Sequence, residues 1–240
     1  MRSVKKSARA VLVTGGTGAL GAATIRRFLE DGHSVTSPSR AVQSVNGLAT
    51  IFHQFGDRFH AVQADVTDAG SVDVLVQHAV ARFGTIEVLV HLVGGWAGGQ
   101  SLQDHPLATW DRAIDLNLRS AFLCARAVLP LMRQHAWGRI VLISSQAARS
   151  HRQGQGAYAI AKAGVSVLAE TIAEENNDLD VTANVVAPSF LDTPTNRASL
   201  PAAEHGSLVS IEDVAEMISF LSSQEAGQLR GAWLPAFGRR

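Results

Sequence analysis

The stretch "VLVTGGTGALG" (residues 11–21) decides the fold. The apolar run "VLV" leads into glycines at positions 15, 18 and 21, and the helix-forming run "ALGAATIRRFLEDG" (19–32) follows directly. In the first turn of a nucleotide-binding sheet, such glycines permit a tight turn, close approach of the backbone to a pyrophosphate, and close packing of the helix. A glycine-rich turn without a ligand is the alternative. The order of strand, glycines and helix favours a nucleotide site.

Strand and helix patterns alternate along the rest of the chain. The predicted strands cover 9–13, 33–36, 58–64, 86–93, 139–144, 180–187 and 231–236. The fourth and fifth are nearly continuous apolar runs, as in strands that are covered on both faces. The pattern predicts an α/β fold, a doubly wound parallel sheet (Rossmann fold) with helices on both faces, in a single domain over residues 1–240. We expect residues 1–8 to be a flexible N-terminal segment, and residues 189–209, rich in Pro, Ser and Ala, to be a substrate lid.

The composition argues against several classes of protein. The chain has 21 basic and 21 acidic residues, so no surface for nucleic acid or an anionic membrane is expected. Cys124 is the only cysteine, which excludes an internal disulfide and fits a reducing compartment. No apolar run has the length of a signal peptide or a membrane span, and the histidines show no metal-ligand spacing. We expect a soluble, cytoplasmic protein without a metal site.

The end of the second predicted strand indicates which dinucleotide binds. A site for NAD usually has an acidic residue roughly 20 positions beyond the glycines, bonded to the ribose 2′-hydroxyl. Residues 32–56 contain no acidic residue, and Ser37, Ser39 and Arg40 stand at the end of the strand. A hydroxyl beside a guanidinium suits a 2′-phosphate. NADP(H) is therefore favoured over NAD(H), with a solvated loop charge as the alternative role for Arg40.

A second motif, "YAIAK" (158–162), carries the chemistry. Tyr158 and Lys162 are four residues apart, so they share one face of a helix. An ammonium beside a tyrosine stabilises the phenolate and lowers its pKa, which makes the tyrosine a better acid at neutral pH. Thirteen residues earlier, "LISSQ" places Ser144 and Ser145 at the end of a strand, where a hydroxyl could face the same cleft. Ser144 is expected to be structural.

The glycine turn, the serine and the Tyr-x-x-x-Lys pair resemble the short-chain dehydrogenase/reductase family in order and spacing, from about residue 9 to residue 238. The stretches "WDRAIDLNLRSAF" (110–122), "QADVT" (63–67) and "APSFLDT" (187–193) are similar to further segments of that family. The resemblance implies the catalytic residues Asn117, Ser145, Tyr158 and Lys162. It and the residues above imply a cofactor site made of Gly15, Thr17, Gly18, Ala19, Leu20, Ser39, Arg40, Asp65, Val66, Gly94, Gly95, Tyr158, Lys162, Pro188 and Thr193. The expected substrate contacts are Trp96, Ser145 and Tyr158.

Three positions depart from the family pattern. Ala19 stands where the common fingerprint has Gly, Ser189 replaces a Gly after Pro188, and "HLVG" (91–94) replaces Asn-Asn-Ala-Gly. The following "GGWAGG" (94–99) and the later "LDTPTNR" (191–197) resemble the dihydropteridine reductase branch, in which the tryptophan lines the pterin pocket. That branch uses NADH and lacks the serine, whereas this chain has Ser145.

The leading hypothesis for function is an NADP(H)-dependent oxidoreductase that transfers hydride between nicotinamide and a carbonyl or alcohol. Tyr158 would be the general acid or base, Ser145 would bond the substrate oxygen, Lys162 would support both tyrosine and cofactor, and Asn117 would anchor a water. The alternatives are reduction of a quinonoid dihydropterin and a regulator that binds NADP without turnover. Residues 94–105 and the lid would choose a small-molecule substrate. The family also implies a homodimer or homotetramer, formed through helices over about 107–135 and 156–175.

Overall fold

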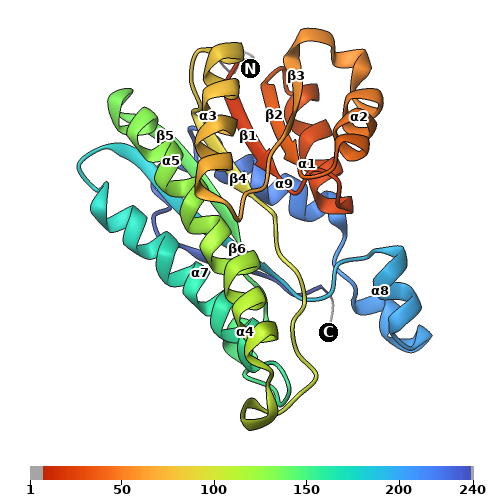
Figure 1. The fold of residues 1–240 in the computed structure, drawn as a ribbon. Helices are drawn as coiled ribbons and strands as arrows, with labels where there is room; N and C mark the ends of the chain where they lie inside the picture. Colours follow the sequence, from red (N-terminus) through yellow and green to blue (C-terminus); the bar gives the residue numbers. More distant parts are fainter. Residues whose placement is uncertain (1–7, 239–240) are drawn as a thin grey trace.

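The core of the molecule is a parallel sheet of seven strands. The computed structural model describes residues 8–238, so the N-terminal segment predicted over 1–8 lies outside them except for Ala8. The strand order is β3-β2-β1-β4-β5-β6-β7 (Figure 1). The strands are β1 (Ala10–Thr14), β2 (Ser34–Ser39), β3 (Phe59–Gln63), β4 (Val88–His91), β5 (Trp137–Ile143), β6 (Asp180–Pro188) and β7 (Trp233–Ala236). Every predicted strand has its counterpart, and the prediction of a doubly wound sheet is confirmed.

Helices connect the strands on both sides of the sheet. They are α1 (Ala19–Glu30), α2 (Val42–Ile51), α3 (Ala69–Phe83), α4 (Leu107–Ile114), α5 (Ser120–Gln134), α6 (Ala147–Ser150), α7 (Gly156–Glu175), α8 (Pro194–Ser199) and α9 (Ile211–Leu221). Local signals set their ends. The Asp68 side chain accepts a hydrogen bond from the Ser71 N–H at the start of α3, and Gly84 ends that helix in the left-handed conformation.

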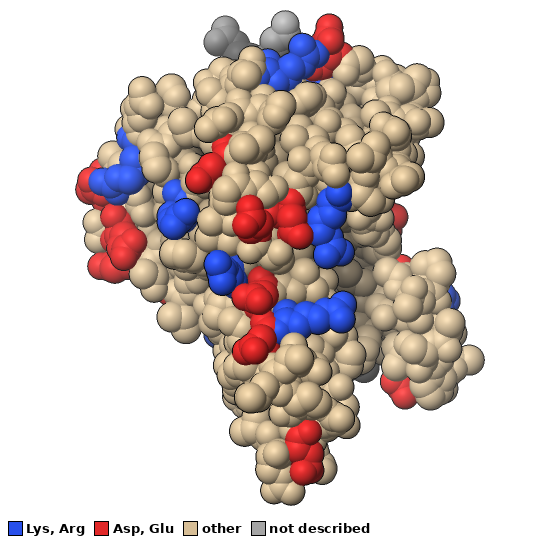
Figure 2. All heavy atoms as spheres, viewed as in Figure 1, with Lys and Arg blue, Asp and Glu red and all other residues tan. Residues whose placement is uncertain are grey.

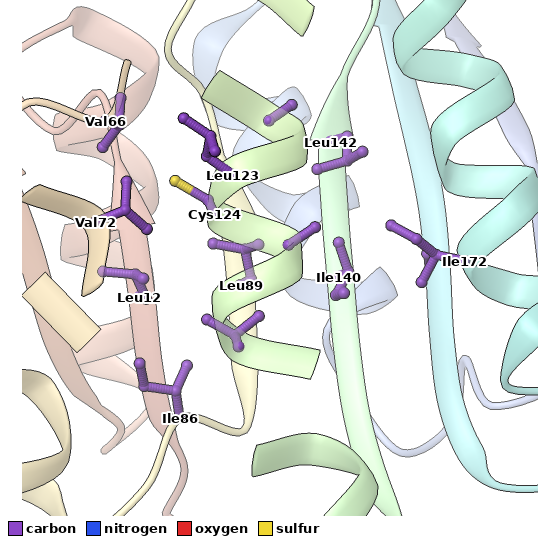
Figure 3. Packing of buried hydrophobic residues seen from close by; sticks show 14 of the residues in the cluster. Leu12, Val66, Val72, Ile86, Leu89, Leu123, Cys124, Ile140, Leu142 and Ile172 are labelled. Atoms are coloured by element: carbon purple, nitrogen blue, oxygen red, sulfur yellow. The ribbon is translucent and has the colours of Figure 1, made fainter. Parts of the chain in front are cut away.

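Strand residues alternate between two hydrophobic cores. Leu12 and Leu89 pack with α3, α5 and α7 on one face, whereas Val11, Val13 and Val88 pack with α1, α2 and α9 on the other. The two helix layers are visible in Figure 1, and Figure 3 shows the first core around Leu89. Because both faces are covered, successive strand residues are all apolar, which explains the continuous runs in the sequence.

The chain reverses its direction of travel across the sheet at β1. From β1 it passes to β2 and β3 on one side, and it then returns to β4 on the other side. Thr14 at the end of β1 is paired with His91 at the end of β4. At such a switch point the loops that follow the two strands diverge and leave a crevice at the carboxyl edge of the sheet. The glycine-rich turn and the "GGWAGG" loop both begin here.

Residues 189–209, predicted as a lid, contain more regular structure than the sequence indicates. Thr193 caps α8 by accepting a hydrogen bond from the Asn196 N–H, and a short 3-10 helix follows at Ala202–Ser207. A bridge between Leu191 and Val209 closes the base of the segment. In Figure 1, α8 stands apart from the sheet.

Charges are mixed over the surface. On the face drawn in Figure 2, basic and acidic side chains are interspersed and no large area has a single sign. Among residues 8–238, no helix combines the length and apolar character needed to cross a bilayer. The location of the protein in the cell stays a prediction from the sequence.

Candidate active site

A cavity of about 400 Å³ lies in the crevice between β1 and β4. Eight of the residues predicted to bind cofactor line it: Gly15, Thr17, Gly18, Ser39, Arg40, Asp65, Val66 and Gly94. They come from the turns after four neighbouring strands, and the parallel topology brings all these turns to one edge. The cavity lining also contains residues that the sequence interpretation did not select, namely Pro38, Ala41, Ser44, Ala64, Thr67, Leu92, Val93 and Leu116.

Glycines let the backbone form the wall of this cavity. Gly15 has a φ of +76°, which side chains rarely tolerate, and a Cβ at Gly21 would lie 2.1 Å from the Gly15 carbonyl oxygen. Any side chain at position 21 would therefore push α1 away from the turn. Gly18 and Ala19 stand at the start of α1, and a Cβ at Gly18 would meet only the Gly15 carbonyl oxygen, 3.4 Å away. Alanine at position 19, where the family pattern has glycine, is therefore compatible with this turn. The two positions that exclude a side chain, Gly15 and Gly21, are still glycine.

The far end of the cavity combines hydroxyls with one guanidinium. Ser39, Arg40 and Ser44 line this end, and Asp65 is the only carboxylate among the lining residues. The Asp65 carboxylate accepts hydrogen bonds from the Thr67 N–H at 2.9 Å and the Thr67 hydroxyl at 2.7 Å. Burial acts to raise the pKa of Asp65, but these bonds and the charge of Arg40 hold it below the ordinary value. A cavity with glycines in its wall and a guanidinium at this end fits a phosphorylated nucleotide.

Three side chains of the predicted catalytic set lie together outside the cavity lining, with the Lys162 Nζ beside Gly94. Lys162 on α7 is buried and donates a hydrogen bond from Nζ to the Ile143 carbonyl at 2.9 Å. Its Nζ lies 5.8 Å from the centre of the Tyr158 ring. Ser145, which follows β5, hydrogen-bonds the Tyr158 side chain. Helical spacing on α7 and the end of β5 thus place these groups together, as the sequence predicts.

Burial governs the pKa values of Lys162 and Tyr158. Burial lowers the pKa of Lys162 to about 8, and no ion pair to Lys162 occurs within residues 8–238. Burial also raises the pKa of Tyr158, while the hydrogen bond with Ser145 acts in the opposite direction. The expectation that Lys162 lowers the pKa of Tyr158 is therefore not met. Loss of hydration outweighs the hydrogen bond with Ser145, and Tyr158 is a protonated phenol at neutral pH.

Ser144 has the structural role that the sequence predicts. Its hydroxyl donates to the Lys162 carbonyl at 2.7 Å and accepts from the Ser166 hydroxyl at 3.2 Å. These bonds fix the end of β5 to the second turn of α7. The relative position of Ser145 and Tyr158 depends on this connection.

Asn117 holds the loop after β4. It lies in a turn of π-helix (Asp115–Arg119) that joins α4 to α5. Its side-chain oxygen accepts from the Gly95 N–H, and its amide donates to the Gly95 carbonyl, both at 3.0 Å. A Cβ at Gly94 would lie 2.8 Å from the Asn117 oxygen and 2.9 Å from the Lys162 Nζ. Glycine at position 94 therefore lets the loop pass directly over both polar groups.

His91 stands where the family pattern has asparagine, and both of its ring nitrogens have hydrogen-bond partners. Its Nδ1 lies 3.0 Å from the Thr14 hydroxyl, and its Nε2 lies 3.0 Å from the Ser120 hydroxyl. Thr14 accepts from the Leu92 N–H and Ser120 donates to the Leu116 carbonyl, so Nδ1 accepts and Nε2 donates. Burial, with a smaller contribution from the charge of Lys162, lowers the pKa of His91 to about 3. A neutral imidazole thus links β1, β4 and α5 beneath the cavity.

Trp96 lies over Tyr158 and not in the core. Its ring centre is 5.2 Å from that of Tyr158, with the planes at 59°, and 60% of the residue is exposed. A Cβ at Gly98 would come within 2.5 Å of the indole, so this glycine lets the ring lie against the loop backbone. The indole is therefore part of the wall beside the Tyr158 hydroxyl.

Some predicted cofactor residues lie outside the cavity lining. Leu20 is a buried residue of α1, Gly95 is hydrogen-bonded to Asn117, Pro188 ends β6, and Thr193 caps α8. Ala19, Tyr158 and Lys162 also lie outside the lining. Thr67 was missed, although its place two residues after Asp65 in a loop is a signal for a side-chain-to-backbone turn. No cluster of side chains that could hold a metal ion occurs in the described part of the chain.

A family model described as short chain dehydrogenase matches residues 9–204. The chain belongs to the short-chain dehydrogenase/reductase family. Curated members of the family resemble it over almost their whole length. The 3-oxoacyl-[acyl-carrier-protein] reductase MabA of Mycobacterium bovis is 34% identical over 96% of this chain and 92% of its own. The cis-4-hydroxycyclohexanecarboxylate dehydrogenase of Sinomonas cyclohexanicum is also 34% identical, over 96% of this chain and 95% of its own.

Solved structures of the family agree with the fold. ElxO with NADP bound is 25% identical, covers 95% of this chain and 97% of its own, and superposes with a TM-score of 0.88. A blue fluorescent protein from a metagenomic library, in complex with NADPH, is 28% identical over 96% of each chain, with a TM-score of 0.84. The chain is an NAD(P)-dependent oxidoreductase of the short-chain dehydrogenase/reductase type. The alternative of a regulator without turnover finds no support among these relatives.

Proposed function

We propose that the protein is an NADP(H)-dependent enzyme that interconverts a carbonyl compound and its alcohol, with Tyr158 as the general acid or base. The observation that carries the proposal is the grouping of Ser145, Tyr158 and a buried Lys162 beside Gly94, which lines the glycine-walled cavity. The nicotinamide, when bound, supplies or accepts the hydride. The protein has to position the substrate, exclude water and move one proton.

Each residue of the group has one task in this proposal. The Ser145 hydroxyl, which also bonds Tyr158, orients the substrate oxygen toward the phenol. Tyr158 is protonated at neutral pH, and burial raises its pKa further, so it holds the proton that it donates to that oxygen during reduction. The Lys162 ammonium lies within reach of the cavity and stabilises the phenolate that donation leaves behind. Asn117 keeps the loop at Gly94 and Gly95 in place between cofactor and substrate.

The preference for NADP(H) rests on the residues at the far end of the cavity. Arg40, with Ser39 and Ser44, would hold a 2′-phosphate through charge-assisted hydrogen bonds. A carboxylate at this place would repel that phosphate, and Asp65, which follows β3, is already hydrogen-bonded to Thr67. The two NADP-bound relatives support the same choice. Pro188 and Thr193 keep their proposed place near the nicotinamide end, at the start of the lid.

Tyr158→Phe tests the proposal directly. The change removes only the acidic proton, so we expect the rate of NADPH oxidation with ketones to fall about 100- to 10,000-fold while NADPH affinity stays within about twofold. Stopped-flow turnover and quenching of tryptophan fluorescence by NADPH measure the two quantities separately. Turnover within a few-fold of the wild type would rule out Tyr158 as the proton donor.

Reduction of a quinonoid dihydropterin is a second candidate. The position of the Trp96 ring 5.2 Å from the Tyr158 ring favours a flat substrate. In that reaction Tyr158 would protonate a ring nitrogen and Ser145 would have no task. Ser145→Ala distinguishes the two candidates, because it should slow ketone reduction strongly and dihydropterin reduction little.

We also propose that two copies of the chain associate through α4, α5 and α7. Apolar side chains are exposed on these helices, among them Leu107 at 79%, Val167 at 59%, Ile160 at 46% and Phe122 at 45%. Burying them against a second copy would remove apolar surface from water. Light scattering during gel filtration should give twice or four times the chain mass of 25.4 kDa, and a monomer would contradict this proposal.

A further inference from the structure

A second cavity, of about 380 Å³, lies on the outer side of Trp96. It is lined by side chains from two loops: Trp96, Gln100 and Ser101 follow β4, and Gln153 and Gln155 precede α7. None of the residues selected from the sequence, apart from Trp96, belongs to it. The cavity is therefore a candidate for the part of the substrate that does not react.

The two loops are joined directly through their backbones. The Gly99 N–H donates to the Gly154 carbonyl at 2.7 Å, and both glycines have positive φ values. A Cβ at Gly98 would lie 2.5 Å from the Gly154 oxygen. Because these glycines let the loops touch, the side chains of Gln100 and Gln153 are brought to the rim of one cavity.

Uncharged polar side chains dominate the lining of this cavity. The residues that line it include no charged side chain and no aliphatic side chain. Gln155 accepts a hydrogen bond from the Ser150 hydroxyl through Oε1, which leaves its NH₂ free to donate. Gln100 and Gln153 have no side-chain hydrogen bond within the described residues, so both can donate and accept. Their amides can pair with the amide or carbonyl groups of a ligand.

Trp96 lies between this cavity and Tyr158. Trp96 belongs to the lining of the cavity and is also the ring that lies 5.2 Å from Tyr158. Gln155 is the residue that precedes α7, three positions before Tyr158. A substrate whose carbonyl oxygen bonds Tyr158 would therefore extend across the exposed indole and reach the glutamines. An indole surface favours a flat ring at this point.

From this arrangement we propose that the enzyme acts on a planar, uncharged ring ketone that carries amide-type hydrogen-bonding groups, and that Gln100 and Gln153 bind those groups. The inference rests on the proposed carbonyl reduction and names the class of substrate. A long acyl chain would find no aliphatic side chain in this cavity, and a carboxylate or phosphate would find no cation. The protein would then differ in substrate from its relative that is named a 3-oxoacyl-[acyl-carrier-protein] reductase.

The test uses two substrates and three variants. Isatin is a planar, uncharged ring with a ketone and a lactam, and cyclohexanone has the ketone alone. Gln100→Leu and Gln153→Leu keep the side-chain volume and remove the hydrogen bonds. Each should raise KM for isatin about three- to tenfold, with a clearly smaller change for cyclohexanone. Gln54→Leu, an exposed glutamine far from the cavity, is the matched control and should change neither KM.

Calorimetry gives a readout that does not depend on turnover. Isatin should bind to the protein loaded with NADP⁺, and either substitution should weaken its binding by the same three- to tenfold factor. An unchanged affinity and KM for isatin in both variants would overturn the assignment of this cavity. Equal effects on both ketones would also overturn it, since they would indicate a displaced loop. If the wild-type protein reduces cyclohexanone while either result holds, the proposed function stands and only the substrate class is wrong.

Discussion

Replacing His91 with asparagine should change how the stability of the protein responds to acid. His91 is buried at the ends of β1 and β4, its two ring nitrogens are paired with hydroxyl groups, and its pKa is lowered to about 3. In the unfolded chain an imidazole takes up a proton at about pH 6.5. Between these values the unfolded state binds one proton more than the folded state. Stability therefore falls as the pH falls through this interval.

The size of the effect follows from the pKa difference. At pH 7 the imidazole of His91 is largely neutral in both the folded and the unfolded state, so its titration changes the free energy of unfolding little. The variant then loses only the hydrogen bonds of His91, which lowers its free energy of unfolding by about 1–3 kcal/mol. At pH 4, about 2.5 units below the pKa of the free imidazole, folding of the wild type must release that proton, which costs about 3 kcal/mol. The wild type should thus be more stable at pH 7, and the difference should vanish or reverse near pH 4.

Urea unfolding at pH 7, 5.5 and 4, followed by tryptophan fluorescence, measures this difference. Other acid-sensitive groups are shared by the two proteins and cancel in the comparison. His53→Asn, at an exposed position, controls for removal of an imidazole as such. If the stability difference between wild type and His91→Asn is the same at pH 7 and pH 4, His91 is not a neutral buried group and the reasoning is wrong.

Three further substitutions test the cofactor and substrate contacts. Arg40→Ala should weaken NADPH binding by about 1.5–3 kcal/mol and NADH binding much less, as measured by fluorescence quenching, and equal losses would contradict a 2′-phosphate contact. Trp96→Ala should raise KM for flat ring substrates with little change in melting temperature, because Trp96 is 60% exposed, whereas a core tryptophan would cost about 3–5 kcal/mol. Gly94→Ala places a carbon 2.8 Å from the Asn117 oxygen and should lower kcat by about 10- to 100-fold in steady-state assays. The control is Gly47→Ala, where a Cβ meets nothing within 4 Å, and equal effects would refute the steric argument.

The strands and the proximity of Tyr158 to Lys162 could be predicted because each depends on a local pattern in the sequence. A strand that is covered on both faces must be apolar at every position, as in β4 and β5, and the sequence shows this directly. Tyr158 and Lys162 are one helical turn apart, so their proximity needs only the helix. The topology then brings the turns after β1, β2, β3 and β4 to one edge, which explains why most of the predicted cofactor residues line one cavity.

Other features depend on contacts between distant segments and left no readable pattern. The glutamine-lined cavity exists because the loops at Gly99 and Gly154 touch, and their separation in the chain gives no indication of this. The pKa of Tyr158 was expected to fall, since spacing reports the neighbouring ammonium but not the extent of burial. The predicted helix over 107–135 was correct in extent, yet the π turn at 115–119 is stabilised by Asn117 bonding to Gly95 and was not foreseen.

That π turn has a consequence for every alignment and every engineered deletion in this region. A π turn accommodates one residue more than an α turn, and each residue of an α-helix advances by about 100° around the axis. Before the π turn α4 contacts α7, and after it α5 packs against β4 and β5. Deleting a single residue from 115–119 would leave a straight and regular helix. Both halves would then keep the faces that pack on α7 and on the sheet, whereas deleting one residue within Ser120–Gln134 would rotate the residues on one side of the gap by about 100°.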